Sequence, residues 1–325
     1  MKRFTVDDTQ LTCRAVLEVA GCTCTVATND SGLPGVLEPF RSASPRDCGE
    51  FEMRVMVHDE PGEPNCLPHF RGLHHLVFAS FGQFDLFVFD LEQRRVSAAI
   101  SKRLARDHTF WHERMVPIII GVLGCTVGVL PFHSACLSIN GDGLLIAGPS
   151  GAGKSTLSVA LAKLGFDFVS DDWTYINCVS QFIEAHGLLA PIKLLPDAIK
   201  HFPELTNRQV CVAMNGELAY EASPESTFSI SVARRCRPRW LVFVDRTAGD
   251  NAEFVEISPD TALAYIDSNV ERLPVQLATA AENRETIKEK IATLSCWRFR
   301  HDGTPEDAAR ELYAFVSRQL VGASA

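Results

Sequence analysis

Eight consecutive residues near the middle of the chain constrain its fold more than any other feature. They read GPSGAGKS, from Gly148 to Ser155, and match the pattern GxxxxGK[ST] at every fixed position. The apolar segment LLIAG precedes them, and the segment STLSVALAKLG that follows has its apolar residues on one helical face. A strand, a glycine-rich turn and a helix in this order predict a phosphate-binding loop in an α/β fold.

The residue types in this loop suit a nucleotide bound with magnesium. Gly151 and Gly153 let the backbone curl so that several N–H groups point into one concavity, where the helix presents its positive end. Lys154 can reach the β- and γ-phosphates, and Ser155 can place its hydroxyl on Mg²⁺. We therefore expect ATP and Mg²⁺ as cofactors. The predicted nucleotide contacts are Gly148, Ser150, Gly151, Ala152, Gly153, Lys154, Ser155 and Thr156.

The loop alone does not define the reaction, because GTPases, ATP-driven motors and kinases share it. No LSGGQ-like segment of the ABC-type ATPases follows it, and no NKxD-like base-reading motif of the GTPases is present. These two absences argue against an ABC-type ATPase and against a GTPase without excluding either class.

Paired carboxylates form a second candidate site. The segment FVSDD ends in Asp171 and Asp172, only 17 positions after Lys154 (171 − 154). So short a return predicts a strand beside the strand of the loop, with its carboxyl end facing the phosphates. Adjacent carboxylates repel each other unless a cation lies between them or one of them holds a proton. A pair that binds a metal with one carboxylate and takes the proton of an acceptor hydroxyl with the other would explain both residues. The alternative is a solvated turn, where Asp is common. A second apolar strand, WLVFVD, ends in Asp245, which we interpret as part of an ordinary turn.

The segment from Phe132 to Asp172 resembles the catalytic domain of HPr kinase/phosphorylase and its relatives, including the HPr-kinase-like enzymes of lasso-peptide clusters. The shared pattern is a histidine at the head of a β-hairpin, the GxxGxGKS loop and a pair of Asp. Here His133 precedes Gly148 by 15 positions (148 − 133). The resemblance implies a P-loop kinase domain of the HPr kinase and phosphoenolpyruvate carboxykinase type, with a mixed β-sheet.

The resemblance also implies roles for individual residues. Asp171 would be the catalytic base, Asp172 would support magnesium and the base, and His133 would lie beside this pair and tune it. The implied metal ligands are Ser155 and Asp172. The segment APIKLLPDA, from Ala190 to Ala198, is similar to a stretch common in the peptide-cluster relatives.

The two ends of the chain differ in pattern. Segments rich in Val, Phe and Thr, among them FEMRVMVHD and HHLVFASF, predict strands in the first hundred residues. After the phosphate loop, FSISVA predicts a further strand, and we expect the C-terminal part to be helical, with Thr304 as the candidate N-cap of the last helix. We expect a strand-rich domain over 1–106, which is a candidate for acceptor recognition, and a nucleotide-binding catalytic domain over 107–325. The uncharged stretch from Met115 to Phe132 contains several Pro and Gly residues, so we interpret it as a buried helix followed by a turn into a strand.

Charge and cysteine content limit the partners and the compartment. The formal net charge is −9, which disfavours sequence-independent nucleic-acid binding. The 11 cysteines include no CxxC pair, so zinc and a disulfide framework are both disfavoured. The start, MKRFTVDDTQ, has no apolar stretch of a secretory signal. We expect a cytoplasmic protein without nucleic-acid or membrane partners, and the resemblance allows a homo-oligomer.

The leading hypothesis is a kinase that transfers the γ-phosphoryl group of ATP to a hydroxyl of a peptide, a protein or a small molecule. The alternatives are a nucleotide-dependent regulatory module with slow hydrolysis, and a phosphoserine phosphorylase. Four arginines could neutralise phosphate charge or form a solvated loop: Arg234, Arg235, Arg237 and Arg239. Lys193 is a weaker candidate of the same kind.

Overall fold

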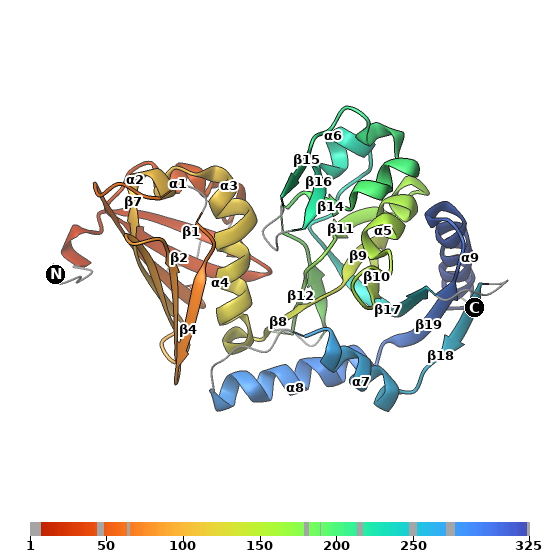
Figure 1. The fold of residues 1–325 in the computed structure, drawn as a ribbon. Helices are drawn as coiled ribbons and strands as arrows, with labels where there is room; N and C mark the ends of the chain where they lie inside the picture. The colour runs from red at the N-terminus through yellow and green to blue at the C-terminus, as the bar shows by residue number, and fades with distance from the viewer. Residues whose placement is uncertain are drawn as a thin grey trace. The chain divides into compact units, whose positions relative to one another are not determined.

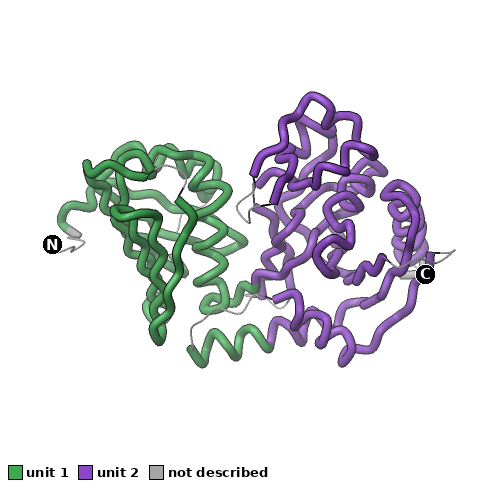
Figure 2. Tube along the Cα trace, viewed as in Figure 1, with its two compact units in different colours: residues 1–130, 272–285 green, residues 131–271, 286–325 purple. Residues whose placement is uncertain are grey.

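The structure, a computed structural model, describes residues 8–43, 49–63, 66–178, 182–188, 190–212, 217–246, 252–270 and 277–323. The chain forms a mixed α/β fold with several sheets and divides into two compact units (Figures 1 and 2). Unit 1 comprises residues 1–130 and 272–285, and unit 2 comprises residues 131–271 and 286–325.

This division lies beyond the boundary expected after residue 106. The helical segment that follows Asp107 belongs to unit 1, because its aromatic rings pack on the sheet of that unit. The ring centroid of Phe110 lies 4.9 Å from that of Phe81, and the centroid of Trp111 lies 6.1 Å from that of Phe87. Trp111 is fully buried.

Unit 1 contains a seven-stranded mixed sheet in the order β1-β2-β3-β7-β6-β5-β4. The strands are β1 (Cys13–Val19), β2 (Cys22–Thr28), β3 (Phe51–His58), β4 (His69–Leu73), β5 (Leu76–Phe81), β6 (Asp85–Asp90) and β7 (Arg95–Ser101). The segments FEMRVMVHD and HHLVFASF thus form β3 and β5, as expected. Inward residues of β3 alternate with half-exposed ones, which is the pattern of a sheet with one buried face.

Short helices accompany this sheet. They are η1 (Asp8–Gln10), α1 (Leu33–Val36), η2 (Glu38–Phe40), α2 (Lys102–Ala105), α3 (His108–Phe110), the π-helical η3 (Trp111–Met115), α4 (Val116–Leu123) and η4 (Gly124–Val127). The continuous stretch His108–Val127 is long and apolar enough to cross a membrane, but 67% of its most apolar window is buried inside the structure. Gly128, with a φ of 80°, ends the stretch and leads into β8, as expected for a core helix and turn.

Unit 2 is built on a nine-stranded mixed sheet. Its strands are β8 (Val129–Phe132), β9 (Ala135–Ile139), β10 (Asp142–Ala147), β11 (Asp167–Ser170), β12 (Thr174–Asn177), β13 (Glu184–His186), β17 (Arg235–Arg246), β18 (Glu253–Glu256) and β19 (Ser295–His301). β10 lies between β9, which is antiparallel to it, and β17, which is parallel to it. β19 continues the sheet beyond β17 and is parallel to β17.

Helices and a small sheet complete unit 2. The helices are α5 (Lys154–Lys163), η5 (Pro196–Lys200), η6 (Pro203–Leu205), α6 (Pro224–Phe228), α7 (Pro259–Ser268), α8 (Ala278–Ala292, which also supplies unit 1) and α9 (Pro305–Ala323). The small sheet has the order β14-β16-β15, with β14 (Ile192–Leu194), β15 (Val210–Val212) and β16 (Leu218–Ala222). The core joins β9, β10 and β17 to α5 and α9.

Three expectations about unit 2 are wrong. β11 does not lie beside β10, because β9 is inserted between them; β11 still runs parallel to β10, so both strands end at the same edge. The segment FSISVA is not a strand, because Phe228 ends α6 and Ser229 is left-handed, although Val232 forms an isolated bridge with Phe168. The C-terminal part is not purely helical, since it supplies β18 and β19.

Candidate active site

The glycine loop, residues 148–153, connects β10 to α5 (Figure 1). Gly151 and Gly153 have φ angles of 80° and 86°, a left-handed conformation that favours glycine. A Cβ at Gly148 would lie 2.6 Å from the carbonyl oxygen of Val244, so the loop begins in close contact with β17. The chain therefore turns sharply at the carboxyl edge of the sheet and presents the start of α5 there.

Lys154 is the first residue of α5 and is buried. Its ammonium donates to the carbonyl oxygens of Gly148 and Pro149, at 2.9 and 3.3 Å, so the side chain folds back across the loop. Burial lowers the pKa of Lys154, and the negative charges of Asp172 and Asp171 oppose this shift. The positive charge of Lys154 thus interacts with the negative charges of both aspartates.

Asp171 follows the end of β11 and is only 8% exposed. Its Oδ2 accepts a hydrogen bond of 3.1 Å from the backbone N–H of Lys193 in β14. Its Oδ1 is buried and has no hydrogen-bond partner among the described residues. Burial raises the pKa of Asp171 to about 6, reinforced by the charge of Asp172 and opposed by the Ser155 hydroxyl and by Lys154. This carboxyl group is therefore poised to exchange a proton near neutral pH.

Asp172 has a different environment from its neighbour. Its side chain is 50% exposed, and its Oδ1 lies 2.9 Å from Nε2 of His133. Burial acts to raise the pKa of Asp172, but the hydrogen bond and charge of His133, with the charges of Lys193 and Lys154, hold it below its usual value. The imidazole of His133 packs on the Trp173 ring at a centroid distance of 5.2 Å. Asp172 is thus kept as a carboxylate, which suits it to a cation.

Hydroxyl groups fix the backbone beneath the two aspartates. The Thr174 hydroxyl donates to the carbonyl oxygen of Ser134 at 2.8 Å and lies 2.6 Å from the Ser170 hydroxyl. The Ser134 hydroxyl donates in turn to Thr174 at 3.1 Å. All three side chains are buried. The network joins the residue after His133 to both ends of the turn that carries Asp171 and Asp172.

The structure thus brings most predicted site residues together. His133, Lys154, Ser155, Asp171 and Asp172 are linked by the contacts and charges described above. The remaining loop residues shape the turn: Ala152 is buried, and the Thr156 hydroxyl donates to the carbonyl oxygen of Gly153 at 2.8 Å. Lys193, a weak candidate in the sequence, contacts Asp171 through its backbone and influences Asp172 through its charge.

The arginine cluster lies elsewhere. Arg237 pairs in register with Asp142, the first residue of β10, and Arg239 Nε lies 2.6 Å from the carboxylate of Asp142. The guanidinium of Arg237 also lies 4.2 Å above the ring of Phe182. Because β10 and β17 are parallel, these arginines lie at the amino edge of the sheet, opposite the glycine loop. The hypothesis that these arginines neutralise phosphate charge at the glycine loop is therefore wrong. The alternative, that they form a solvated loop, is also wrong for Arg235, Arg237 and Arg239, because these three residues lie on β17.

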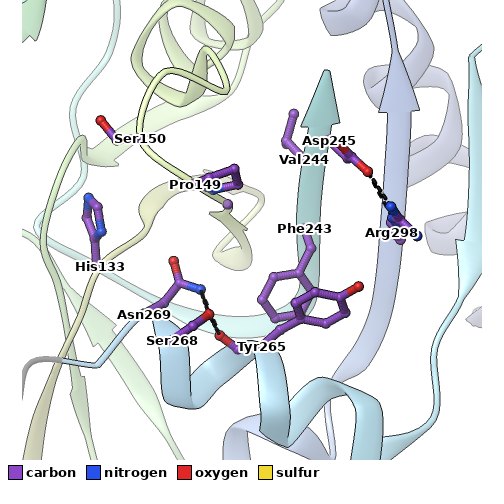
Figure 3. Close-up of a pocket in the computed structure, with 11 residues that line it drawn as sticks. His133, Pro149, Ser150, Phe243, Val244, Asp245, Tyr265, Ser268, Asn269 and Arg298 are labelled. Carbon is purple, nitrogen blue, oxygen red and sulfur yellow. Dashed lines mark hydrogen bonds and ion pairs between the residues drawn. The ribbon is translucent and has the colours of Figure 1, made fainter. Parts of the chain in front are cut away.

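A cavity of about 460 Å³ opens directly below the start of the glycine loop (Figure 3). Its walls come from the loop, the carboxyl end of β17, the end of α7 and β19. They are formed by His133, Gly148, Pro149, Ser150, Phe243, Val244, Asp245, Tyr265, Ser268, Asn269 and Arg298. The side chains of Asp245 and Arg298 form an ion pair, with both guanidinium contacts on Oδ2 of Asp245.

The expectation that Asp245 lies in an ordinary turn is wrong, because Asp245 lies within β17, and its side chain lines this cavity. Sequence reasoning also missed Tyr265, Asn269 and Arg298, because no motif links them to the loop. The one available signal was the apolar run before Asp245, which is typical of a strand next to a phosphate loop. The backbone N–H of His133 donates to the carbonyl oxygen of Asn269 at 2.8 Å, which ties the end of α7 to the histidine.

The oxygen atoms of the site suit magnesium. Among the residues that the structure describes, no group of three or more His, Cys, Asp or Glu side chains is arranged to hold a metal ion. Mg²⁺ does not need such a cage, because it commonly binds one or two carboxylates together with phosphates and water. The carboxylate of Asp172 and the Ser155 hydroxyl are the groups that could hold it.

Comparisons with known proteins assign the chain to no family. No family model matches the chain, and no curated protein matches it. Among solved structures, the chain is similar to the HPr(Ser) kinase/phosphatase from Coxiella burnetii, at 12% sequence identity and a TM-score of 0.32. The match covers 60% of this chain and 99% of that chain. A likeness of this size assigns no function, so what the site can do follows from its own residues.

Proposed function

We propose that this protein is an ATP- and Mg²⁺-dependent kinase that transfers the γ-phosphoryl group to a hydroxyl acceptor. One observation carries the proposal. Asp171 is a buried carboxyl group with one unpartnered oxygen and a pKa raised to about 6, and it interacts electrostatically with the lysine that begins α5. A base of this kind, held beside a phosphate-binding loop, is the group that an acceptor hydroxyl requires.

The loop and the start of α5 would hold the phosphates. Backbone N–H groups at the amino end of α5 favour anions, and Lys154 adds a positive charge at the same place. Lys154 now donates to Gly148 and Pro149, so it would exchange these carbonyl partners for phosphate oxygens. Asp172 and the Ser155 hydroxyl would hold Mg²⁺, which would supply neutralisation of the phosphate charge.

Asp171 would take the proton of the acceptor hydroxyl through Oδ1. The acceptor oxygen then forms a bond to the γ-phosphorus while the bond between that phosphorus and the bridging oxygen breaks, which leaves ADP. Lys193 would hold Oδ2 through its backbone N–H, so that Oδ1 keeps its orientation. The acceptor we propose is a Ser or Thr hydroxyl of a peptide or protein, or a small alcohol.

The experiment is a transfer assay with γ-labelled ATP and a cell extract, run with wild type and Asp171→Asn. We expect label on a macromolecule or metabolite with wild type, loss of transfer by at least about a hundredfold in the variant, and nucleotide affinity within about threefold of wild type in both. Asp167→Asn is the matched control, because Asp167 begins the same strand at the opposite edge of the sheet. Full transfer by Asp171→Asn, or free phosphate as the sole product of wild type, would refute the proposal.

A further inference from the structure

The cavity below the glycine loop extends away from the aspartate pair. At one end it is lined by His133, which bonds Asp172. At the other end it is lined by Asp245 and Arg298, on strands at the opposite side of β10 from β11 (Figure 3). If the terminal phosphate faces Asp171 and Asp172, as the proposed function requires, the remainder of a nucleotide runs from the loop toward this far end.

The far end of the cavity is unsuited to further phosphate. Asp245 carries a carboxylate there, and its ion pair with Arg298 leaves that end without a free positive charge among the described residues that line it. The positive end of α5 lies on the loop side instead. Charge therefore separates the two regions, with anions favoured at the loop and a neutral polar group favoured in the cavity.

Aromatic and polar groups in the cavity match a nucleoside. The rings of Tyr265 and Phe243 pack at a centroid distance of 4.8 Å, and Tyr265 is half-buried, so part of its ring remains open to the cavity. Arg298 takes up Oδ2 of Asp245 and leaves Oδ1 without a hydrogen-bond partner among the described residues. A free carboxylate oxygen can accept hydrogen bonds from ribose hydroxyls, and a volume of about 460 Å³ is in the range of small-molecule pockets.

We infer that this cavity binds the nucleoside of the phosphate donor, with the base on Tyr265 and the ribose hydroxyls on Asp245. The inference rests on the proposed function, which places the terminal phosphate at the aspartate pair. A nucleoside in this cavity means that the phosphate donor is a nucleotide and not an inorganic polyphosphate. Arg298 acts as a positioning residue, since it orients the carboxylate of Asp245 and cancels part of its charge.

The test compares the affinities of Mg-ATP and Mg-tripolyphosphate, which share the phosphate chain and differ in the nucleoside. Wild type should bind Mg-ATP at least about tenfold more tightly. Tyr265→Ala should lose about tenfold in affinity for Mg-ATP and nothing for Mg-tripolyphosphate, because stacking on an aromatic ring contributes on that order. Tyr265→Leu keeps the packing on Phe243 and should show the same selective loss, which guards against misfolding of the alanine variant.

Tyr313→Ala is the matched control, since Tyr313 of α9 is also a partly exposed tyrosine that packs against a phenylalanine, Phe166. It should leave both affinities unchanged. Equal affinity of wild type for the two ligands, or an equal loss of both in the Tyr265 variants, would overturn the nucleoside assignment while leaving a phosphate donor site. Failure of wild type to bind either ligand would overturn the proposed function as well.

Discussion

Nε2 of His133 lies 2.9 Å from Oδ1 of Asp172, and this contact separates the protonation behaviour of two adjacent carboxyl groups. The histidine helps to hold the pKa of Asp172 below its usual value, whereas burial raises the pKa of its neighbour Asp171 to about 6. One carboxylate therefore stays charged for a cation while the other can accept a proton. Pairs of acids whose environments separate their pKa values in this way are typical of acid–base sites.

Replacement of His133 by alanine should reduce this separation. Without the imidazole, the pKa of Asp172 rises toward its usual value. The transfer rate should fall by about tenfold to a hundredfold, which is the usual cost of removing a group that orients a ligand. The measurement is the pH dependence of kcat/KM for wild type and variant. His133→Gln keeps an N–H donor and should recover part of the loss; identical pH profiles for all three proteins would contradict this role.

Asp171 should make the protein less stable as pH rises. Its pKa is raised from 3.8 to about 6 in the folded state, so the native protein keeps a proton that the unfolded chain has released. The loss of folding free energy caused by ionising Asp171 is absent below pH 3.8 and grows between pH 3.8 and about pH 6. Above about pH 6 it is complete and reaches about 3 kcal/mol. Asp171→Asn removes it.

The measurement for this prediction is the free energy of urea unfolding without Mg²⁺ at several pH values. The variant should be more stable than wild type at pH 7.5 and should lose that advantage toward pH 4. Asp167→Asn again serves as the control, because it changes the same residue type at the other end of β11. A variant that is equally stable, or less stable, at pH 7.5 would show that burial of this carboxyl group carries no such cost.

Ser155→Ala should weaken nucleotide binding only in the presence of magnesium. The hydroxyl is one of the two oxygen groups proposed to hold the metal, whereas the phosphate contacts of the loop would be made by backbone N–H groups and Lys154. We expect about a tenfold loss of affinity for Mg-ATP and no change for ATP in EDTA, measured by calorimetry. Ser158→Ala on the same helix is the control, because the Ser158 hydroxyl donates to the carbonyl oxygen of Lys154. A loss that persists in EDTA would argue against a metal role.

Thr174→Val should destabilise unit 2 by about 1–3 kcal/mol, because the hydroxyls of Ser134 and Ser170 and the carbonyl of Ser134 would lose a buried partner. Thr206→Val removes an exposed hydroxyl that donates to Pro203 and should cost far less. Urea unfolding of both variants gives the comparison. Equal effects of the two substitutions would mean that the buried network contributes nothing specific.

Several local features of the fold were predictable from the sequence. The turn between β9 and β10 contains Asn140 and Gly141 at φ angles of 55° and 84°, as an Asn-Gly hairpin requires. The helix α9 begins as expected, with the hydroxyl of Thr304 accepting from the backbone N–H of Asp307 at 3.2 Å. Each of these features depends on residues within a few positions of one another, so a short window of sequence contains all the interactions involved.

Other features depended on pairings between distant segments. The insertion of β9 between β10 and β11 could not be inferred from chain length, because a short return is compatible with either neighbour. The place of β19 beside β17 joins residues more than 50 positions apart and turned an expected helical region into part of the sheet. The role of Lys193 followed from its backbone contact with Asp171, which no motif records.

The sequence by itself determined the glycine loop, the helix that follows it and the presence of an acid pair soon afterwards, because φ preferences, helix periodicity and chemical type are local properties. The tertiary structure decided which carboxyl group is buried and which is paired with His133. It also moved the arginine cluster to the opposite edge of the sheet and joined Tyr265, Asp245 and Arg298 into one cavity. Burial and strand order set those outcomes, and both arise only when segments far apart in the chain pack together.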